Sequence, residues 1–130
     1  MTRDRIGKYW LDSANQDYEA MESLLLNGHY VWSLFVGRLV VEKLLKAYHV
    51  RNSDSPLPHI HNLLRLAEGA GLELNPGQSV FLDEVTAFNI RARYPDYKNR
   101  FSKTATREFT TQYIDRIKEF RQWLLPLLTK

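Results

Sequence analysis

Hydrophobic residues recur every three or four positions along most of the chain, which is the spacing of one buried helix face. In the first segment, about residues 2–27, this face comprises Leu11, Ala14, Tyr18, Met21 and Leu25. Gly28 follows where a left-handed residue commonly ends a helix, and the next hydrophobic run begins at once. The pattern therefore predicts two helices joined by a tight antiparallel turn.

The second helix, from about Tyr30 to Val50, is hydrophobic around nearly its whole circumference. Its main polar stripe is Arg38, Glu42 and Lys46, spaced by four, so that Glu42 can pair with either neighbour. A helix of this kind must be covered on most faces. It is either the centre of a bundle or the site where a second subunit packs, and we expect both.

Three further helices are expected after a loop at 51–58 that contains two prolines. A short helix should cover about 60–70. The next should begin at Asn75 and Pro76, and it should end near Arg93 because Pro95 disfavours helical geometry at Tyr94. Its inward residues would be Val80, Phe81, Val85 and Phe88.

The last helix should start at Thr104 or Thr106. Its buried stripe would be Phe109, Tyr113, Ile117, Phe120, Leu124 and Leu127. No alternating strand pattern competes with these helices. The fold class is therefore all-α, an up-and-down antiparallel bundle of four or five helices in a single domain over residues 1–130.

The composition of the chain says more about its cellular compartment than about its chemical function. The chain has 130 residues and no cysteine, which excludes disulfides and thiolate metal sites and is typical of a reducing cytoplasm. The N-terminal segment has no signal-peptide pattern, and no hydrophobic run is long enough for a membrane span. We therefore expect a cytoplasmic protein without membrane contact.

Positive charge is concentrated in one segment, although the net charge is only +3. Between residues 91 and 107, six basic residues accompany a single acidic one, Asp96. Within this segment the candidate nucleotide- or RNA-binding residues are Arg91, Arg93, Tyr94, Tyr97, Lys98 and Arg100. Arginine can make two parallel hydrogen bonds to a phosphate, and tyrosine can stack on a base, so the segment is a candidate RNA contact. The alternative is structural: arginines at a helix C-terminus satisfy terminal carbonyls, and the tyrosines cover the end of the bundle.

Other arrangements of reactive residues are weaker. His59 and His61 could hold a metal, but no third ligand is near them in sequence, so we expect no metal and His61 should bond backbone or a neighbouring loop. Asp83 and Glu84 do not share a helix face, and Glu84 is expected to neutralise a basic neighbour. No glycine-rich phosphate loop or serine triad is present, and we expect no cofactor.

Several short motifs together resemble the HEPN family of helical domains. In chain order they are Ala14-x-x-Asp17, Gly28-His29-Tyr30, Val41-Glu42-Lys43-Leu44-Leu45-Lys46-Ala47, Pro58 with His61-Asn62-Leu63, and Arg93-Tyr94-Pro95. No single motif is specific, but their order and spacing are. The resemblance implies a helical bundle that is usually a homodimer and is often encoded beside a minimal nucleotidyltransferase.

Many members of the wider family resemble RNA-cleaving toxins that use an Arg-x4-6-His motif. This chain departs from that pattern, because no histidine follows Arg91 or Arg93. The spacing of Arg91 and Tyr97 is similar to the Arg-x4-x-Tyr of family toxins paired with nucleotidyltransferases, in which a tyrosine receives AMP; Tyr94 and Tyr97 are the candidates here.

The resemblance thus favours a nucleotide- or RNA-binding module, the toxin-like partner of a nucleotidyltransferase. One alternative is a metal-independent ribonuclease with Arg91 and Tyr97 as candidate catalytic residues. Tyrosine has an ordinary pKa of about 10 and is a poor base at neutral pH. The other alternative is a purely structural partner subunit.

Overall fold

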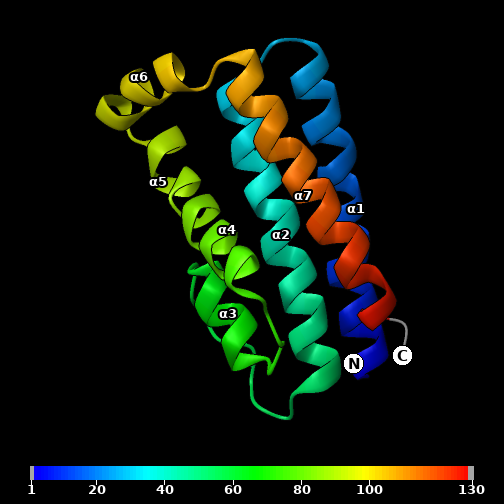
Figure 1. Ribbon diagram of the computed structural model, residues 1–130. Helices are drawn as coiled ribbons and strands as arrows, with labels where there is room; N and C mark the ends of the chain where they lie inside the picture. Colours follow the sequence, from blue (N-terminus) through cyan, green and yellow to red (C-terminus); the bar gives the residue numbers. More distant parts are fainter. Residues whose placement is uncertain (1, 129–130) are drawn as a thin grey trace.

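Helices make up most of the computed structural model, which describes residues 2–128. They are α1 (Arg3–Leu26), α2 (Tyr30–Asn52), α3 (Leu63–Gly69), α4 (Pro76–Thr86), α5 (Phe88–Arg93), α6 (Pro95–Thr104) and α7 (Arg107–Leu128). Figure 1 shows α1, α2, the α4–α5 pair and α7 running alternately up and down, so that the start of α1 and the end of α7 lie at the same end. The predicted all-α up-and-down bundle is confirmed.

The turn between α1 and α2 forms as the sequence predicts. Gly28 has a φ of 77°, in the left-handed region that glycine adopts without strain. The N–H of Gly28 donates to Leu25 O at 3.2 Å and that of His29 donates to Leu24 O at 2.9 Å, which satisfies carbonyls at the end of α1. Helix α2 begins at Tyr30 directly afterwards, and the two helices pack along their length.

Helix α2 is the centre of the bundle. It contacts α1, α3, α5, α6 and α7. A Cβ atom placed on Gly37 would lie 2.7 Å from Ile117 Cδ1 of α7 and 3.1 Å from Met21 Sδ of α1, so a glycine at this position lets three helices approach closely. Trp32 remains 40% exposed. The central position is thus confirmed, whereas the second subunit stays a prediction.

The helix expected to run from Asn75 to Arg93 is interrupted. Its start is as predicted: Asn75 and Gln78 form a reciprocal capping box, with Pro76 in the first turn. Its continuity was predicted wrongly, since α4 ends at Thr86 and α5 begins at Phe88. At the break, the hydroxyl of Thr86 donates to Leu82 O at 2.8 Å and accepts from Leu63 N at 3.1 Å, tying the end of α4 to the start of α3.

Two other expectations about this region were wrong. Val80 was expected to face inward, but it is 58% exposed, while Phe81 next to it is buried. No helix was expected between Pro95 and the start of the last helix, and this segment is helix α6. Proline does disfavour helical geometry in the residue before it, and Tyr94 is extended. However, its fixed φ is also suited to a first helical turn, so Pro95 starts the next helix.

Aromatic side chains hold α5, α6 and α7 together. Phe88 packs against Phe101 with ring centroids 5.3 Å apart and against Tyr113 edge-on, also at 5.3 Å. Phe109 lies 4.9 Å from Tyr113 and 6.3 Å from Phe101. Phe101 is completely buried, so it anchors the otherwise polar α6 to the bundle.

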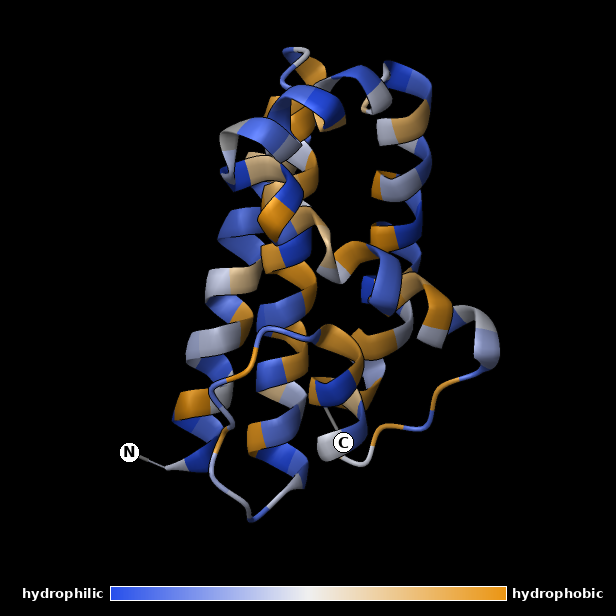
Figure 2. Ribbon diagram, turned by 90° about the vertical axis from the view of Figure 1, so that its left-hand side faces the viewer, coloured by the Kyte–Doolittle hydropathy of each residue, from blue (hydrophilic) through white to orange (hydrophobic). Residues whose placement is uncertain are grey.

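Helix α7 begins where one of the two predicted starts placed it. The hydroxyl of Thr106 accepts from Phe109 N at 3.2 Å, and the helix runs from Arg107. Its predicted stripe is buried or packs against the core. Figure 2 shows the general separation: hydrophobic residues recur on the inward sides of the helices and hydrophilic ones on the outward sides. Among the described residues, no helix is long and apolar enough to cross a membrane.

Candidate nucleic-acid interface

The bend between α5 and α6 places aromatic and basic side chains on the outside of the bundle. Tyr94 is 56% exposed and Tyr97 is 51% exposed. Arg93, in the last turn of α5, is exposed and its Nη1 donates to Asn89 Oδ1 at 3.5 Å. We use the name elbow surface for Arg93, Tyr94, Tyr97, Lys98 and Arg100.

Two of the elbow cations pack on aromatic rings. Lys98 Nζ lies 4.4 Å from the ring centroid of Trp32 on α2, which ties α6 to the start of α2. The guanidinium of Arg100 lies 5.9 Å from the ring of Tyr97. A cation held on a ring still presents donors to solvent, and an exposed tyrosine can stack on a base. The elbow surface can therefore contact both the phosphates and the bases of a single strand.

Arg91 differs from the other predicted binding residues. Its guanidinium lies 4.2 Å from the ring of Phe101, which is fully buried, and Arg91 is itself half-buried. Its predicted partner Tyr97 is on the exposed surface of α6. Arg91 is thus packed as a support of the α5–α6 junction, whereas Arg93 and Arg100 have the more exposed guanidinium groups.

A second group of charged residues lies on the side of α2 that faces α3 and α4. The guanidinium of Arg38 is 1% exposed and pairs with Glu42 at 3.1 Å. It also donates to the carbonyl of Thr86 at 3.4 Å and to the carbonyl of His61. Glu42 in turn pairs with Lys46 at 3.4 Å. The predicted pairs along this stripe are confirmed, but the stripe is a buried network and not a solvated face.

His61 completes this network. Its imidazole Nδ1 lies 3.2 Å from Glu42 Oε1. Because an ionised carboxylate only accepts hydrogen bonds, Nδ1 carries the proton and donates. The His61 side chain is 72% exposed, so Nε2 faces away from the carboxylate and towards solvent. We expected the side chain to bond backbone or a loop, and this was wrong: the loop places it on the carboxylate of α2.

The charges in this network depend on one another. Burial favours the neutral acid, but Arg38, Lys46 and His61 outweigh burial and lower the pKa of Glu42 below its ordinary value. Burial lowers the pKa of Arg38, against the effect of Glu42, and the positive charge of Arg93 adds to this decrease. The charge of Arg93 thus links the elbow surface electrostatically to this network.

Comparison with known protein families shows what kind of domain carries the elbow surface and the charged network on α2. Residues 8–127 match the HEPN domain. The chain belongs to the HEPN family. No curated protein matches the chain, and no solved structure matches it either.

Membership of the HEPN family confirms the resemblance carried by the short motifs, and it supports a nucleotide- or RNA-related module in general terms. Two of those motifs meet in the structure, because His61 contacts Glu42. This meeting is a tertiary feature, because 19 positions separate Glu42 from His61.

The sequence indicated the ion pairs of this site but not the approach of His61 to them. The spacing of Arg38, Glu42 and Lys46 gave the ion pairs along α2, but nothing in it indicated that a loop would bring His61 there. No group of three or more histidine, aspartate or glutamate residues that could hold a metal ion occurs within residues 2–128. The elbow surface and the network on α2 together offer cations, aromatic rings and the exposed imidazole of His61.

Proposed function

We propose that this HEPN domain is a nucleotide- or RNA-binding module that holds single-stranded RNA on its elbow surface. The observation that carries the proposal is the combination of half-exposed Tyr94 and Tyr97 with Arg93, Lys98 and Arg100. Aromatic rings beside a basic groove are how proteins bind single strands with little sequence preference. Asp96 is the only acidic residue between 91 and 107, so the local field favours a polyanion.

The test is RNA binding measured by fluorescence anisotropy at low salt. Arg93→Gln removes an exposed cation of the elbow surface, and Arg65→Gln removes an exposed cation of α3 as a matched control. We expect Arg93→Gln to weaken binding across RNA sequences and Arg65→Gln to leave it unchanged. Equal effects of the two variants would locate binding elsewhere, and no binding by the wild type would leave the structural-subunit alternative.

The proposal includes a homodimer. Among the residues of α2, Trp32 is the only large hydrophobic side chain that is exposed, at 40%, and it packs edge-on against half-buried Phe35. A second copy packing there would bring two elbow surfaces together, because Lys98 lies on the same tryptophan. Light scattering should give a dimer for the wild type and a monomer for Trp32→Glu. The control Tyr9→Glu, which replaces another exposed aromatic residue on α1, should remain a dimer. A wild-type monomer at micromolar concentration would contradict the dimer.

The proposed protein partner is a minimal nucleotidyltransferase, for which the domain is the toxin-like component. The partner would transfer AMP from ATP to the phenol oxygen of Tyr94 or Tyr97 and release pyrophosphate. Both phenols are exposed. The added negative charge would oppose RNA binding at the elbow surface. Co-purification with a nucleotidyltransferase encoded in an adjacent gene, followed by mass spectrometry of the tyrosines, tests this part separately.

A metal-independent ribonuclease is the second candidate, and the observation that favours it is the contact of His61 with Glu42. With Nδ1 donating to the carboxylate, Nε2 is free to take the proton of an RNA 2′-hydroxyl. That oxygen would attack the adjacent phosphorus to form a 2′,3′-cyclic phosphate, and the 5′-oxygen would leave with a proton taken from solvent water. His61 suits this role better than Tyr97, whose phenol is a poor base at neutral pH. His61→Asn should abolish cleavage and retain binding; cleavage by that variant would exclude the role.

A further inference from the structure

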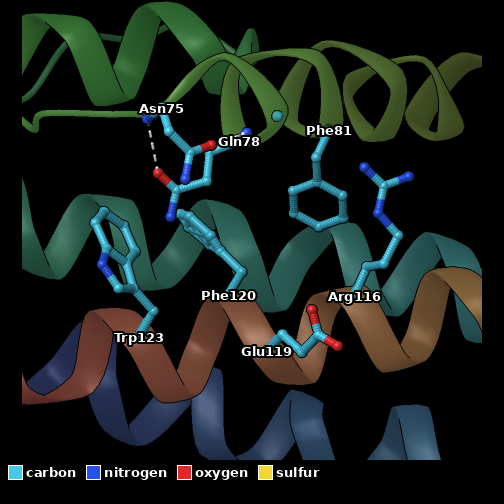
Figure 3. A pocket seen from close by; sticks show the side chains of 8 residues that line it. Asn75, Gln78, Phe81, Arg116, Glu119, Phe120 and Trp123 are labelled. Atoms are coloured by element: carbon cyan, nitrogen blue, oxygen red, sulfur yellow. Dashed lines mark hydrogen bonds between the residues drawn. The ribbon is translucent and has the colours of Figure 1, made fainter.

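The groove between α4 and α7 has polar side chains, but they serve the fold. Asn75 and Gln78 form the capping box of α4, in which their side-chain oxygens accept from backbone N–H groups at 2.8 and 3.0 Å. Arg116 pairs with Glu84 at 3.6 Å. Figure 3 shows the two amides on the α4 side and the guanidinium on α7, and the residues that line the groove include no histidine, lysine, serine or tyrosine. The exposed nitrogen nucleophiles of the domain therefore lie outside this groove.

The chain has four histidines, and their environments differ. His49 is 3% exposed, and its Nε2 lies 3.1 Å from a backbone carbonyl of the loop after α2. His29 and His59 are exposed, and their imidazoles make no hydrogen bond or ion pair with any residue of 2–128. Only His61 combines exposure with a fixed ring, because its side chain is 72% exposed and contacts the carboxylate of Glu42.

The contact with Glu42 determines which nitrogen of His61 can react. Nδ1 donates to Glu42 Oε1 at 3.2 Å, so the neutral ring carries its free lone pair on Nε2. Nε2 is also the nitrogen that faces solvent. A carboxylate on the opposite nitrogen stabilises the positive charge that the ring gains when Nε2 forms a bond. The imidazole of His61 is therefore an accessible nucleophile in its reactive tautomer.

The charges around His61 favour an anionic reagent. The buried guanidinium of Arg38 donates to the backbone carbonyl of His61. Lys46 pairs with Glu42 at 3.4 Å. Arg38 and Lys46 thus place two positive charges beside a single carboxylate, and the field of this group attracts a reagent with negative charge.

We propose that His61 is a phosphoryl-acceptor site, modified on Nε2 by a small activated phosphate donor. With zwitterionic phosphoramidate as the donor, the lone pair of Nε2 attacks phosphorus, the bond from phosphorus to the donor's nitrogen breaks, and that nitrogen leaves as ammonia. The ring becomes an imidazolium whose Nδ1 proton stays hydrogen-bonded to Glu42. The phosphoryl group would occupy the lone pair that the ribonuclease candidate uses, so the modified domain loses that route to cleavage. The modification itself needs no RNA and does not rest on the elbow surface.

The test is incubation of the full chain with phosphoramidate at about pH 8, where an ordinary imidazole with a pKa of about 6.5 is neutral. Intact mass and peptide mapping at alkaline pH then locate the phosphoryl group. We expect one group per chain, on His61, formed about tenfold faster than on His59. Nitrogen-15 signals coupled to phosphorus should place it on Nε2. No modification, equal rates at the two histidines, or a phosphoryl group on Nδ1 of His61 would overturn the proposal.

Variants of the same loop and of α2 sharpen the test. His61→Gln should remove the modification, whereas His59→Gln, two positions earlier, should leave it unchanged. Glu42→Gln should slow the reaction of His61 about tenfold, because a neutral amide does not stabilise the charged ring. In that variant His59 is the internal reference for the rate, and buried His49 should stay unmodified while α2 remains packed.

An unchanged rate at His61 in folded Glu42→Gln would contradict the role of the carboxylate. If Glu42→Gln loses its fold, the ratio of the His61 and His59 rates in the wild type still decides the proposal. The experiment contains no RNA, so its failure would leave RNA binding at the elbow surface unaffected.

Discussion

Replacing Arg38 with methionine should destabilise the bundle strongly. The guanidinium is 1% exposed, and its partners come from three parts of the chain. They are Glu42 on α2, the carbonyl of Thr86 at the end of α4, and the carbonyl of His61 in the loop before α3. Methionine has similar length and no charge, so packing is largely kept while all of these bonds are lost. Removing one partner of a buried ion pair costs about 3–5 kcal/mol, because the other charge is left buried.

The loss in free energy of unfolding for Arg38→Met should fall towards the lower part of the range of about 3–5 kcal/mol. The reason is that Glu42 keeps two other partners, Lys46 at 3.4 Å and His61 at 3.2 Å. Urea unfolding followed by helical circular dichroism measures the free energy of unfolding. The variant Arg38→Met/Glu42→Gln is the control, because it removes the stranded charge and should recover at least about 1 kcal/mol. A loss below about 1 kcal/mol for Arg38→Met alone would refute the account of a buried network that ties α2 to α4.

Three other predictions concern stability. The fold lowers the pKa of Glu42, so its ionised carboxylate stabilises the protein fully above the ordinary glutamate pKa of about 4.3. This contribution is lost as the pH falls through the lowered pKa, and Glu42→Gln should therefore flatten that part of the acid-unfolding curve. Gly37→Ala should cost about 1–3 kcal/mol because its Cβ would lie 2.7 Å from Ile117 Cδ1, whereas Gly69→Ala, which meets nothing within 4 Å, should not destabilise α3 in thermal unfolding. Tyr113→Phe removes the hydroxyl bond to Glu84 across α4 and α7 and should cost about 1–2 kcal/mol in urea unfolding; no change would contradict that bond.

Local signals in the sequence predicted most of the fold. Asn75 and Pro76 fixed the start of α4, Gly28 fixed the first turn, and Thr106 was one of two expected starts of α7. Each signal works within a few residues, through a cap or a backbone angle that the residue type favours. No such local signal marks the interruption at Ala87. It coincides with contacts of the neighbouring Thr86 to Leu63 and Arg38, which are distant in the sequence.

The candidate site also has parts that the sequence indicated and parts that depend on the tertiary structure. The elbow residues are contiguous in sequence, so composition alone indicated Arg93, Tyr94 and Tyr97. The contact between His61 and Glu42 depends on how a loop returns to α2, and the packing of Arg91 on Phe101 depends on the unexpected helix α6. Helical spacing says nothing about contacts of this kind between distant segments.

The central claim is that the elbow surface binds RNA through its cations, and the salt dependence of binding tests it most directly. For a single strand, each phosphate contact contributes about 0.7 to the slope of log affinity against log salt. The double variant Arg93→Gln/Arg100→Gln should therefore lower the magnitude of the wild-type slope by about 1.4. The same slope in wild type and double variant would contradict the claim, because these two cations would then make no contact with the RNA backbone.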